Sequence, residues 1–475
     1  MFGRGLLRRG LLRAAPAARG LSQAAPRAAP RALVARKLEV LDDSGRHGTA
    51  RHRNVVPDND FAGMEVVFLG TGAGGPSVWR SASSVALKLD GETWIFDCGE
   101  GTYRQIMCSK LSFSAITKVF ITHMHGDHIW GLISLLVSNT AITTENEEFK
   151  EINIYGPQGI HRYVLGMINL SECNLPKQAR VVVHEMLGLN EKVREYPACH
   201  SKIDRKLIKA EADGSWKVCE TDQYRVSAAG IRHTCPCIGF VVDEFHKKLK
   251  IDAAKASEMG LRPCPEYRFL QHGMDVTLED GRQIRAADVT FKPRRPRRVV
   301  IVGDTSDPSG LIPIARHPRP DLVIHEATAS NELRDFAMRT GHSTPAMAGR
   351  FAKSLGARSL VLTHLSPRFF QATPNNRRTR PDDDGNFTST DVLVDQAREA
   401  FGSDSVLAAH DFMTLALPAG GLVEAGEDDD YVYVPPEISG RGMPPPGEPV
   451  VAGSQRRPRQ TRGPHVDPPA LDILK

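Results

Sequence analysis

Seven consecutive residues, Thr122-His123-Met124-His125-Gly126-Asp127-His128, constrain this 475-residue chain more than any other segment. Three imidazoles and a carboxylate follow directly after the apolar run 119–121, so they are expected where a strand opens into a loop. Neutral imidazole and carboxylate groups are zinc ligands, and catalytic zinc keeps one position open for water. A histidine-rich loop without metal is the alternative, but four ligand-type side chains in this order favour a metal site.

The spacing within this heptad indicates two metal ions. His123 and His125 are two residues apart, so in extended backbone their side chains project the same way and can share one ion. Asp127 and His128 then turn toward a second ion, because two-metal hydrolytic sites hold their ions roughly 3.5 to 4 Å apart. The heptad alone cannot complete two coordination shells. The remaining ligands must therefore come from other strand ends.

Several further motifs occur in the order that one known family uses. They are Phe68-Leu69-Gly70-Thr71-Gly72, Phe96-Asp97-Cys98-Gly99-Glu100-Gly101-Thr102, Gly303-Asp304-Thr305, His325-Glu326-Ala327-Thr328, His342-Ser343-Thr344 and Leu362-Thr363-His364-Leu365-Ser366-Pro367-Arg368-Phe369. With the heptad, they resemble the metallo-β-lactamase fold and, more narrowly, ribonuclease Z, the tRNA 3′-processing endonuclease. The resemblance covers roughly residues 64 to 418. It implies an α/β fold, an αβ/βα sandwich with an inserted substrate-binding arm.

The same resemblance supplies the ligands that the heptad lacks. His233 would complete the site begun by His123 and His125, Asp304 would bridge both ions, and His364 would complete the shell of Asp127 and His128. A single histidine at a strand end is more often a structural residue, but the joint order of these residues favours ligation. We expect two Zn²⁺ ions per subunit, with Mn²⁺ or Fe²⁺ as alternatives for the same ligands.

The expected chemistry is hydrolysis of a phosphodiester. Water between two cations gives hydroxide near neutral pH, and Asp127 could accept its proton. By resemblance, His342 gives a proton to the departing ribose oxygen and Glu326 orients the imidazole and raises its basicity. The alternative for this motif is a helix start at which Ser343 caps the following helix.

The resemblance to ribonuclease Z implies a zinc-dependent endoribonuclease that cuts precursor tRNA after the discriminator nucleotide and leaves a 3′-hydroxyl. A phosphodiesterase or other hydrolase for a small substrate would keep the same metals on the same fold. A metal-bound RNA-binding protein without turnover would have lost ligands or acid residues. No expected ligand or acid residue is lost in this sequence, which argues against a protein without turnover.

Substrate contacts are predicted in two places. The loop 76–80 resembles the family's proline-containing loop near the RNA 3′ end, where Arg80 would pair with phosphate and Trp79 would stack on a base, unless Trp79 is a packing residue. The basic run 292–298 includes Arg294 and Arg295, which are expected to contact phosphate, although a solvated loop would look the same.

By resemblance, the interval from about Val242 to Pro296 holds the arm that grips the tRNA elbow. Asp280-Gly281 indicates a hairpin turn within it. Cys264 stands where the family's arm has glycine, so the bend of the arm can differ. A homodimer is expected, because short members of the family pair so that one subunit's arm serves the other's site. The polar stretch from about Asn190 to Asp222 is predicted to be a surface loop.

The N-terminus reads as a targeting segment. The first 38 residues contain eight Arg, one Lys and no acidic residue, and can form an amphipathic helix. This favours an organellar transit peptide for the mitochondrion, with the plastid or a basic nucleic-acid-binding arm as alternatives. The formal charge of +5 for the whole chain, less +9 for this segment, leaves −4 for the remainder. Bulk charge therefore gives no support for RNA binding, and any phosphate-binding surface must be local.

The composition and the apolar pattern of the chain predict its remaining domain boundaries. Residues 39–63 are predicted to be a linker, 64–418 the nuclease domain and 419–475 a disordered tail rich in Pro and Gly. No apolar stretch is long enough for a membrane span. Cys235 and Cys237 flank Pro236 and are predicted to be small packing residues in a reducing compartment. Strands are expected at 65–69, 84–89, 93–97, 118–122, 152–155, 297–302, 322–325 and 359–363, and helices at 100–107, 159–170, 344–355 and 392–401.

Overall fold

The computed structural model describes residues 63–143, 149–196, 199–245, 248–278, 280–292, 294–370, 388–417 and 450–451. These residues belong to one compact unit, His52–Lys475. The predicted transit peptide (1–38), the predicted linker up to residue 62 and the predicted tail apart from 450–451 lie outside the described residues.

The first sheet contains the strands of the N-terminal half and one C-terminal strand. Its order is β19 (Thr414–Ala416), β1 (Met64–Gly70), β2 (Ser84–Leu89), β3 (Thr93–Phe96), β4 (Ile116–Phe120), β5 (Lys150–Pro157), β6 (Ala179–Leu187) and β7 (Ile203–Lys209). Strands β1 to β3 pair antiparallel, whereas β3 to β7 run parallel. Parallel strands end at one edge of a sheet. The residues that follow β3 and β4, Asp97 and Thr122, therefore meet there, and the Thr122 main-chain N–H donates to Asp97 Oδ1 at 2.7 Å.

The second sheet brings four strand ends of the C-terminal half to a common edge. Its order is β18 (Val406–Ala408), β15 (Leu360–Thr363), β14 (Leu322–Glu326), β13 (Arg298–Ile301), β10 (Cys237–Glu244), β9 (Tyr224–Ile231) and β8 (Ser215–Glu220). Strands β13, β14, β15 and β18 are parallel, and β10 is antiparallel to both β13 and β9. As a result, β9 ends at the same edge as β13, β14 and β15. This topology gathers His233, Asp304, Glu326 and His364.

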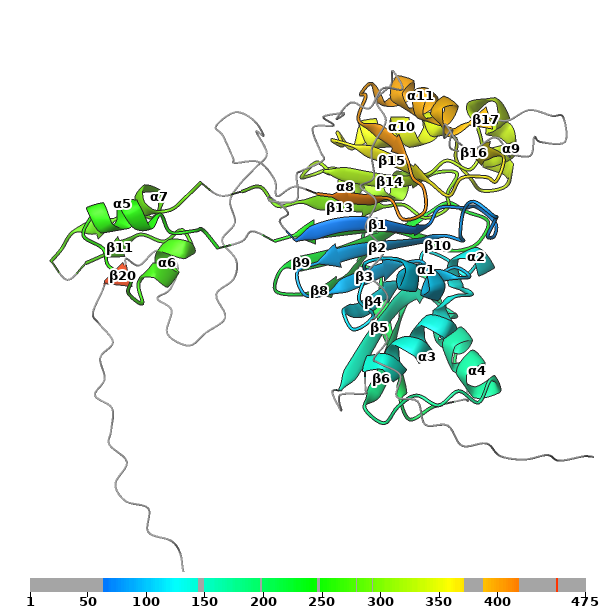
Figure 1. Cartoon of the computed structure of the whole chain (residues 1–475), viewed down its shortest axis with the longest axis horizontal. Coiled ribbons are helices and arrows are strands. Elements are labelled where there is room, and N and C mark those ends of the chain that lie inside the picture. The colour runs from blue at the N-terminus through cyan, green and yellow to red at the C-terminus, as the bar shows by residue number, and fades with distance from the viewer. Residues whose placement is uncertain are drawn as a thin grey trace, which may run out of the picture. The chain divides into compact units, whose positions relative to one another are not determined.

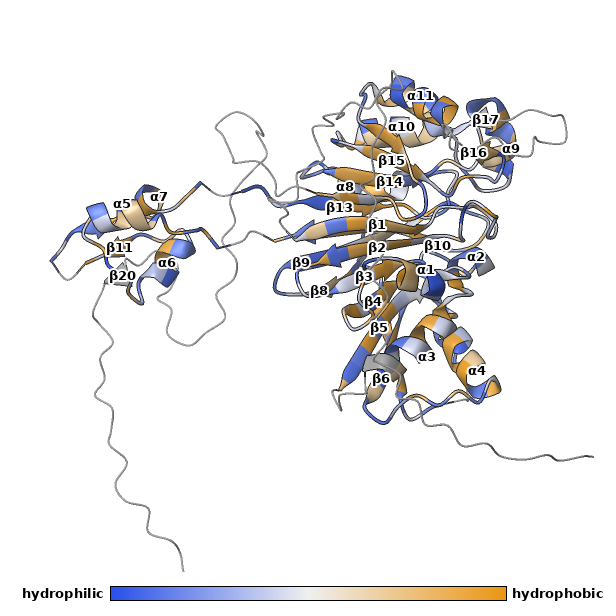
Figure 2. Ribbon diagram, viewed as in Figure 1, coloured by the Kyte–Doolittle hydropathy of each residue, from blue (hydrophilic) through white to orange (hydrophobic). Residues whose placement is uncertain are grey.

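The inner faces of the two sheets pack against each other through aromatic rings. The rings of Phe96 and Phe120 in the first sheet lie 5.8 and 5.5 Å from that of Phe240 in the second. Helices α1 (Thr102–Cys108), α3 (Leu132–Thr143) and α4 (Ile160–Leu170) cover the outer face of the first sheet, and α10 (Pro345–Ser354) and α11 (Thr390–Phe401) cover that of the second (Figure 1). Central strands such as β1 and β2 are largely apolar, whereas α4 and α11 are mixed in character (Figure 2). The predicted αβ/βα sandwich is confirmed.

Short elements complete the body. They are α2 (Gly126–Ile129), the 3₁₀ helices η3 (Ser309–Leu311) and η4 (Asn331–Leu333), α8 (Ile312–Ala315), α9 (Arg334–Arg339), β16 (Phe369–Phe370) and β17 (Thr388–Ser389). Within the described ranges, no helix has both the length and the apolar character that a bilayer span requires.

The prediction of a surface loop at 190–222 was wrong, because this stretch contributes β7 to the first sheet and β8 to the second. In β8 the side chains of Trp216 and Val218 are buried while Lys217 between them is exposed. Such an alternation suits a strand with one face on the core. Only these two apolar residues carry the pattern in a polar context, which is why it was missed.

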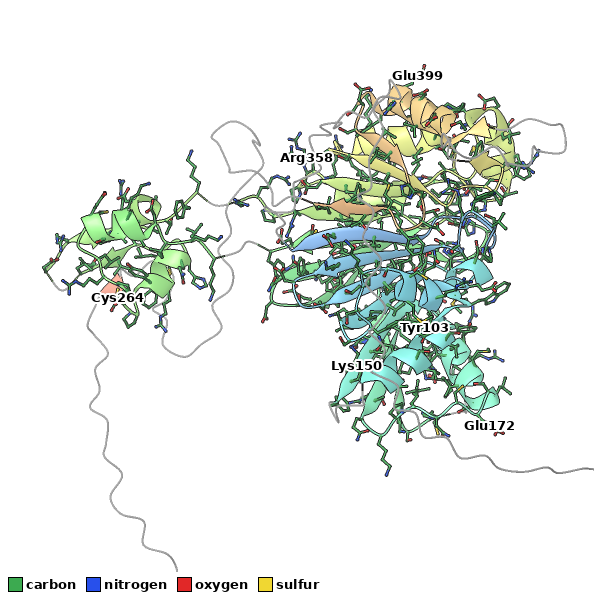
Figure 3. The ribbon with its side chains drawn as sticks, viewed as in Figure 1. Tyr103, Lys150, Glu172, Cys264, Arg358 and Glu399 are labelled. Carbon is green, nitrogen blue, oxygen red and sulfur yellow. The ribbon has the colours of Figure 1, made fainter. Side chains whose placement is uncertain are left out.

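Residues 245–297, between β10 and β13, contain a segment with its own apolar core, called here the arm segment. It contains α5 (Ala253–Glu258), α6 (Tyr267–Gln271), β11 (Val276–Thr277), β12 (Gln283–Ile284) and α7 (Ala286–Val289), and β11 also pairs with β20 (Val450–Val451). Strands β11 and β12 form the antiparallel hairpin that Asp280-Gly281 predicted, with Gly281 at a φ of 84°. Cys264 is half-buried against the core of this segment (Figure 3).

Buried ion pairs join the two strands that flank the arm segment. Arg297 is 1% exposed and binds both carboxylate oxygens of Glu244 at 2.7 and 2.6 Å. Arg298 pairs with Asp243. Arg297 and Arg298, the last two residues of the basic run 292–298, therefore form ion pairs within the protein and do not lie in a solvated loop.

Candidate metal centre and active site

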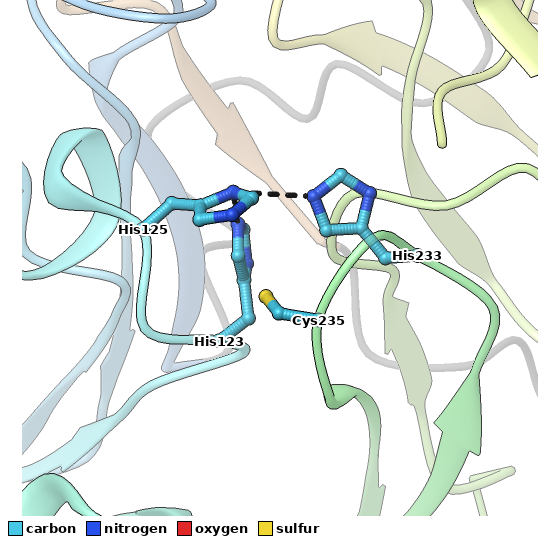
Figure 4. A group of neighbouring side chains, drawn as sticks. All are labelled: His123, His125, His233 and Cys235. Atoms are coloured by element: carbon cyan, nitrogen blue, oxygen red, sulfur yellow. Dashed lines mark hydrogen bonds between the residues drawn. The ribbon is translucent and has the colours of Figure 1, made fainter. Parts of the chain in front are cut away.

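The heptad follows β4 and enters helix α2, which carries Asp127 and His128. Three imidazole nitrogens form what we call the first donor group, and it comes from the heptad and from the turn after β9. Nδ1 of His125 lies 3.1 Å from Nε2 of His123 and 3.2 Å from Nε2 of His233. Tetrahedral zinc bonds of 2.0 to 2.1 Å place two nitrogen donors about 3.4 Å apart. The three nitrogens therefore have nearly the spacing that one ion requires (Figure 4).

The second donor group consists of Asp127, His128 and His364. Nε2 of His364 lies 3.3 Å from Nε2 of His128 and 3.3 Å from Oδ2 of Asp127. Oδ2 of Asp304 lies 3.4 Å from His128 Nε2 and 3.3 Å from His364 Nε2, and it is also 3.8 Å from His123 Nε2 in the first group. Asp304 thus stands between the two groups. The donors fit two divalent cations, and the structure brings together all seven residues predicted as ligands.

Each imidazole in the two groups, except that of His125, has its other nitrogen near a protein oxygen. Nδ1 of His128 donates to Asp97 Oδ2 at 2.7 Å, and Nδ1 of His233 donates to the Gly341 carbonyl at 2.7 Å. Nδ1 of His123 and of His364 lie 2.9 and 3.0 Å from the hydroxyls of Thr122 and Thr328. Partners of this kind fix the tautomer and turn the ligating nitrogen toward the ion.

Asp97 had no role assigned from the sequence, although it belongs to this outer shell. It is 5% exposed, has a φ of 57° and also accepts the hydroxyl hydrogen of Thr122 at 2.9 Å. A carboxylate directly after the strand beside β4 was the available signal. Its use became visible only once β3 and β4 were known to be parallel neighbours.

The ionisation of the donors depends on their burial and on one another's charges. Burial, followed by the charge of the neighbouring His128 imidazole, lowers the pKa of His123 to about 2, which keeps this ring neutral. Although burial opposes ionisation, the hydrogen bond and charge of the nearby histidines hold the pKa of Asp127 well below its usual value. Burial by itself would lower the pKa of His128, but the charges of Asp304 and Asp97 raise this pKa well above its usual value. The two carboxylates thus favour a positive charge at this position, which a bound cation would also supply. In the described part of the chain, the ion-pair partners of Asp127 and Asp304 are all histidines.

His342 and Glu326 form a pair beside the two donor groups. Nδ1 of His342 donates to Oε1 of Glu326 at 3.0 Å, and Oε1 also accepts the Thr305 main-chain N–H at 2.8 Å. Burial alone would lower the pKa of His342, but the hydrogen bond and charge of Glu326 raise it to about 9. The alternative of a Ser343 helix cap is wrong, because its hydroxyl donates to the Thr305 carbonyl and Thr344 is the residue at the cap position.

The donors open onto one cavity of about 350 Å³. Its wall includes His125, Asp127, Asp304, His342 and His364, together with apolar residues of the α9 region and of the segment after β15: Leu333, Phe336, Ala337, Pro367 and Phe369. The cavity thus combines metal-ligating groups and the His342–Glu326 pair with an apolar wall. This arrangement can bind a phosphodiester at its charged end and a ring system at its apolar end.

The residues predicted to contact substrate lie in different environments. Trp79 is 54% exposed, as a stacking surface must be. Arg80 is 5% exposed and donates through Nη1 to the Thr71 hydroxyl at 2.7 Å and the Ala409 carbonyl at 2.8 Å. This interior position does not fit the expected phosphate contact. Arg294 is exposed, whereas Arg295 binds Asp321 through two nitrogens, so it too is engaged within the protein.

Cys235 and Cys237 differ in their surroundings. Cys237 is 3% exposed at the start of β10, as a packing residue would be. Cys235 is half-buried, and its Sγ belongs to the cluster formed by the ligating nitrogens of His123, His125 and His233. The histidines of the heptad that lie beside it come from a distant segment, so this neighbourhood was not visible in the sequence.

The chain is 36% identical over 367 residues to zinc phosphodiesterase ELAC protein 1 from Homo sapiens, which covers 75% of this chain and 99% of that protein. It is 33% identical over 340 residues to ribonuclease Z from Brevibacillus brevis, covering 71% of this chain and 92% of that protein. The crystal structure of human tRNase Z, short form (ELAC1), is 30% identical, covers 75% of this chain and 100% of that chain, and superposes with a TM-score of 0.49. A family profile described as Anti-Pycsar protein Apyc1 matches residues 64–163.

Proposed function

This chain belongs to the ribonuclease Z family of the metallo-β-lactamase superfamily, and from that membership we propose that it removes the 3′ trailer of precursor tRNA. It is a metal-dependent phosphodiesterase, and its cut falls after the discriminator nucleotide and leaves a 3′-hydroxyl. One observation carries this proposal. The His342–Glu326 pair stands beside two complete donor groups and faces the same cavity.

The two donor groups define where the ions belong. His123, His125 and His233 would hold one, Asp127, His128 and His364 the other, and Asp304 would contact both. An imidazole-rich set suits Zn²⁺, and Mn²⁺ or Fe²⁺ are alternatives. Bound there, a pair of divalent cations lowers the pKa of water and neutralises charge on a phosphoryl oxygen.

The protein's own groups handle the protons. Asp127 faces His364 and the Gly74 main-chain N–H through Oδ2, and its other oxygen accepts the proton of the attacking water. His342 is held by Glu326 through Nδ1, so Nε2 is the atom that carries a proton to the departing ribose oxygen. Glu326 is 1% exposed and fixed by Thr305 and Thr328, so it positions the imidazole without moving. A general acid so placed contributes about 10²- to 10⁴-fold to the rate.

RNA contacts in this proposal come from Trp79, from Arg294 and from the arm segment. Trp79 would stack on a base near the cut, and Arg294 and the exposed cations of the arm segment would contact phosphates away from it. Such phosphate contacts make binding salt-dependent. Charge reversal at Arg294 should therefore reduce the salt dependence of tRNA binding without changing cleavage of a small ester.

A small-substrate phosphodiesterase is the second candidate, and the cavity favours it. Its volume of about 350 Å³ is that of a pocket for a nucleotide-sized ligand. In this case the metals and the His342–Glu326 pair keep their roles, and the arm segment has none.

The direct test uses the full chain with a 3′-extended precursor tRNA and with a small phosphodiester, each with and without chelator. We expect chelator-sensitive cleavage of the tRNA at one position, lost in His342→Ala and kept in His200→Ala, which changes a histidine in a turn outside the site. Cleavage of the small ester alone would replace the proposal by the second candidate.

Two further proposals concern assembly and location. We propose a homodimer in which each arm segment serves the partner's site. Mixing an arm-deleted chain with a His364→Ala chain should then restore tRNA cleavage, and a failure to do so while both remain dimeric would contradict it. We also propose that residues 1–38 direct the chain to the mitochondrion. A fluorescent fusion of the full chain should enter mitochondria, and one lacking these residues should not, whereas plastid or diffuse location of the full-chain fusion would overturn this.

A further inference from the structure

Cys235 stands beside the first donor group although no role in hydrolysis needs it. Its Sγ and the ligating nitrogens of His123, His125 and His233 all lie within 4.8 Å of one another. In Figure 4 the sulfur points toward the His123 and His125 rings from the loop that also carries His233. Three imidazole nitrogens and this sulfur therefore surround one position, in addition to the Asp304 carboxylate that was predicted to bridge both ions.

The loop that carries Cys235 is anchored on both sides, so this placement is not that of a free surface thiol. Before it, the Ser306 main-chain N–H donates to the Arg232 carbonyl at 2.8 Å. After it, the Ile238 N–H donates to the Thr122 carbonyl at 2.9 Å, which ties the loop to the strand end that begins the heptad. Pro236 restricts the backbone between these anchors. The same hydrogen bonds that bring His233 to the heptad thus bring Cys235.

The distances are those of an almost closed tetrahedron. The three nitrogens already have coordination spacing, with 3.1 and 3.2 Å to His125 Nδ1. A zinc-type ion with one sulfur bond of about 2.3 Å and nitrogen bonds of about 2.0 Å places sulfur and nitrogen about 3.6 Å apart. From separations of at most 4.8 Å, the sulfur needs to move by about 1 Å, which a small side-chain rotation supplies.

We propose that Cys235 is a fourth donor at the position of His123, His125 and His233, which makes this position a binding site for soft, thiophilic divalent ions such as Cd²⁺. The inference rests on the proposed use of these three histidines as ligands. On binding, the S–H bond of Cys235 breaks, a metal–sulfur bond forms and the proton passes to solvent. Soft thiolate ligands select soft ions, whereas a set of imidazoles alone does not.

A functional consequence follows from the geometry. A bound thiolate would compete with the water that catalysis needs at this ion. The chain with a soft ion at this position is therefore inactive, and a chelator followed by Zn²⁺ restores activity. The packing role predicted for Cys235 has no such consequence, and Cys237, which is 3% exposed, is the cysteine that fulfils it.

The test is a Cd²⁺ titration of the chelator-stripped full chain, followed by its ultraviolet absorption. We expect a sulfur-to-cadmium charge-transfer band with the first equivalents of Cd²⁺, its loss in Cys235→Ser and its persistence in Cys173→Ser, a control at another half-buried cysteine. The dissociation constant for Cd²⁺ should rise by about 10- to 100-fold in Cys235→Ser, at least the loss that an outer-shell partner causes, while that for Zn²⁺ changes less.

A second measurement needs no variant. Alkylation of Cys235 by iodoacetamide, followed by peptide mass spectrometry, should proceed in the stripped chain and be blocked by one equivalent of Cd²⁺. A charge-transfer band that survives in Cys235→Ser, or alkylation of Cys235 at an unchanged rate, would overturn the inference. Both readouts are independent of tRNA cleavage, so a failure of the proposed function would be seen separately.

Discussion

Replacing Asp97 by asparagine should weaken one of the two metal positions more than the other. Oδ2 of Asp97 accepts the Nδ1 hydrogen of His128 at 2.7 Å, and this contact leaves Nε2 of His128 unprotonated for an ion. Asparagine has the same shape and tolerates the φ of 57° at this position. It can keep an oxygen toward Thr122 only by turning its NH₂ group toward His128. The NH₂ group then favours the tautomer with the proton on Nε2, which cannot bind a metal.

The size of the effect follows from this contact. A hydrogen bond to a charged group, such as this one in a 5% exposed position, is worth about 1.5 to 3 kcal/mol. At about 1.4 kcal/mol per tenfold change, the affinity of the second position should fall by roughly 10- to 100-fold, the usual loss for an outer-shell carboxylate. The first donor group is linked to Asp97 only indirectly, through the Thr122 hydroxyl that lies beside His123, and its His233 is held by Gly341, so its affinity should change less.

The assay is a competition titration with a chromophoric chelator, fitted to two metal positions. Asp243→Asn is the matched control, because Asp243 pairs with Arg298 beside the arm segment and contacts no metal ligand in the described residues. One affinity should fall more than the other in Asp97→Asn, and neither should fall in Asp243→Asn. An unchanged pair of affinities, or an equal fall at both positions, would refute the reasoning.

Three further predictions follow. His342→Ala should lower kcat for tRNA cleavage by about 10²- to 10⁴-fold with both metal affinities kept, and a parallel loss of metal would show a structural role instead. In the chelator-treated protein, NMR should give His342 a pKa of about 9, and Glu326→Gln should lower this pKa. Because this pKa lies above the ordinary 6.5, the stability that protonated His342 contributes is fully present below pH 6.5 and is lost as the pH rises through about 9. Urea unfolding at several pH values measures this loss. A Glu326→Gln protein whose unfolding free energy depends on pH in the same way would contradict the prediction. Arg297→Met should lower the free energy of unfolding by about 3 to 5 kcal/mol, because it removes the guanidinium that binds both carboxylate oxygens of the buried Glu244. Adding Glu244→Leu should restore much of this stability, and a double variant no more stable than the single one would count against the reasoning.

Regular local patterns were sufficient for much of the fold. The strand predicted at 84–89 coincides with β2, and the helix predicted at 159–170 begins and ends within a residue of α4. The Asp280-Gly281 hairpin formed as expected, since Gly281 readily adopts the φ of 84° that it has in the turn. Strands with an irregular apolar pattern were not predicted. Examples are β7 and β8, in which a few buried residues stand among charged ones.

The sequence by itself determined the four ligand-type residues of the heptad and the strand end on which they lie, because ligand chemistry and strand periodicity are local properties. Its resemblance to ribonuclease Z supplied His233, Asp304 and His364, and the strand before His233 was not predicted. Only the tertiary structure decided which side chains are left for function. Arg80 and Arg295 form hydrogen bonds with partners that lie 329 and 26 residues away in the chain. Asp97 and Cys235 acquire their neighbours because the order of the strands brings distant segments together. A charged or polar side chain forms hydrogen bonds with the groups that the fold brings within reach. That choice depends on sheet order, which no single segment encodes.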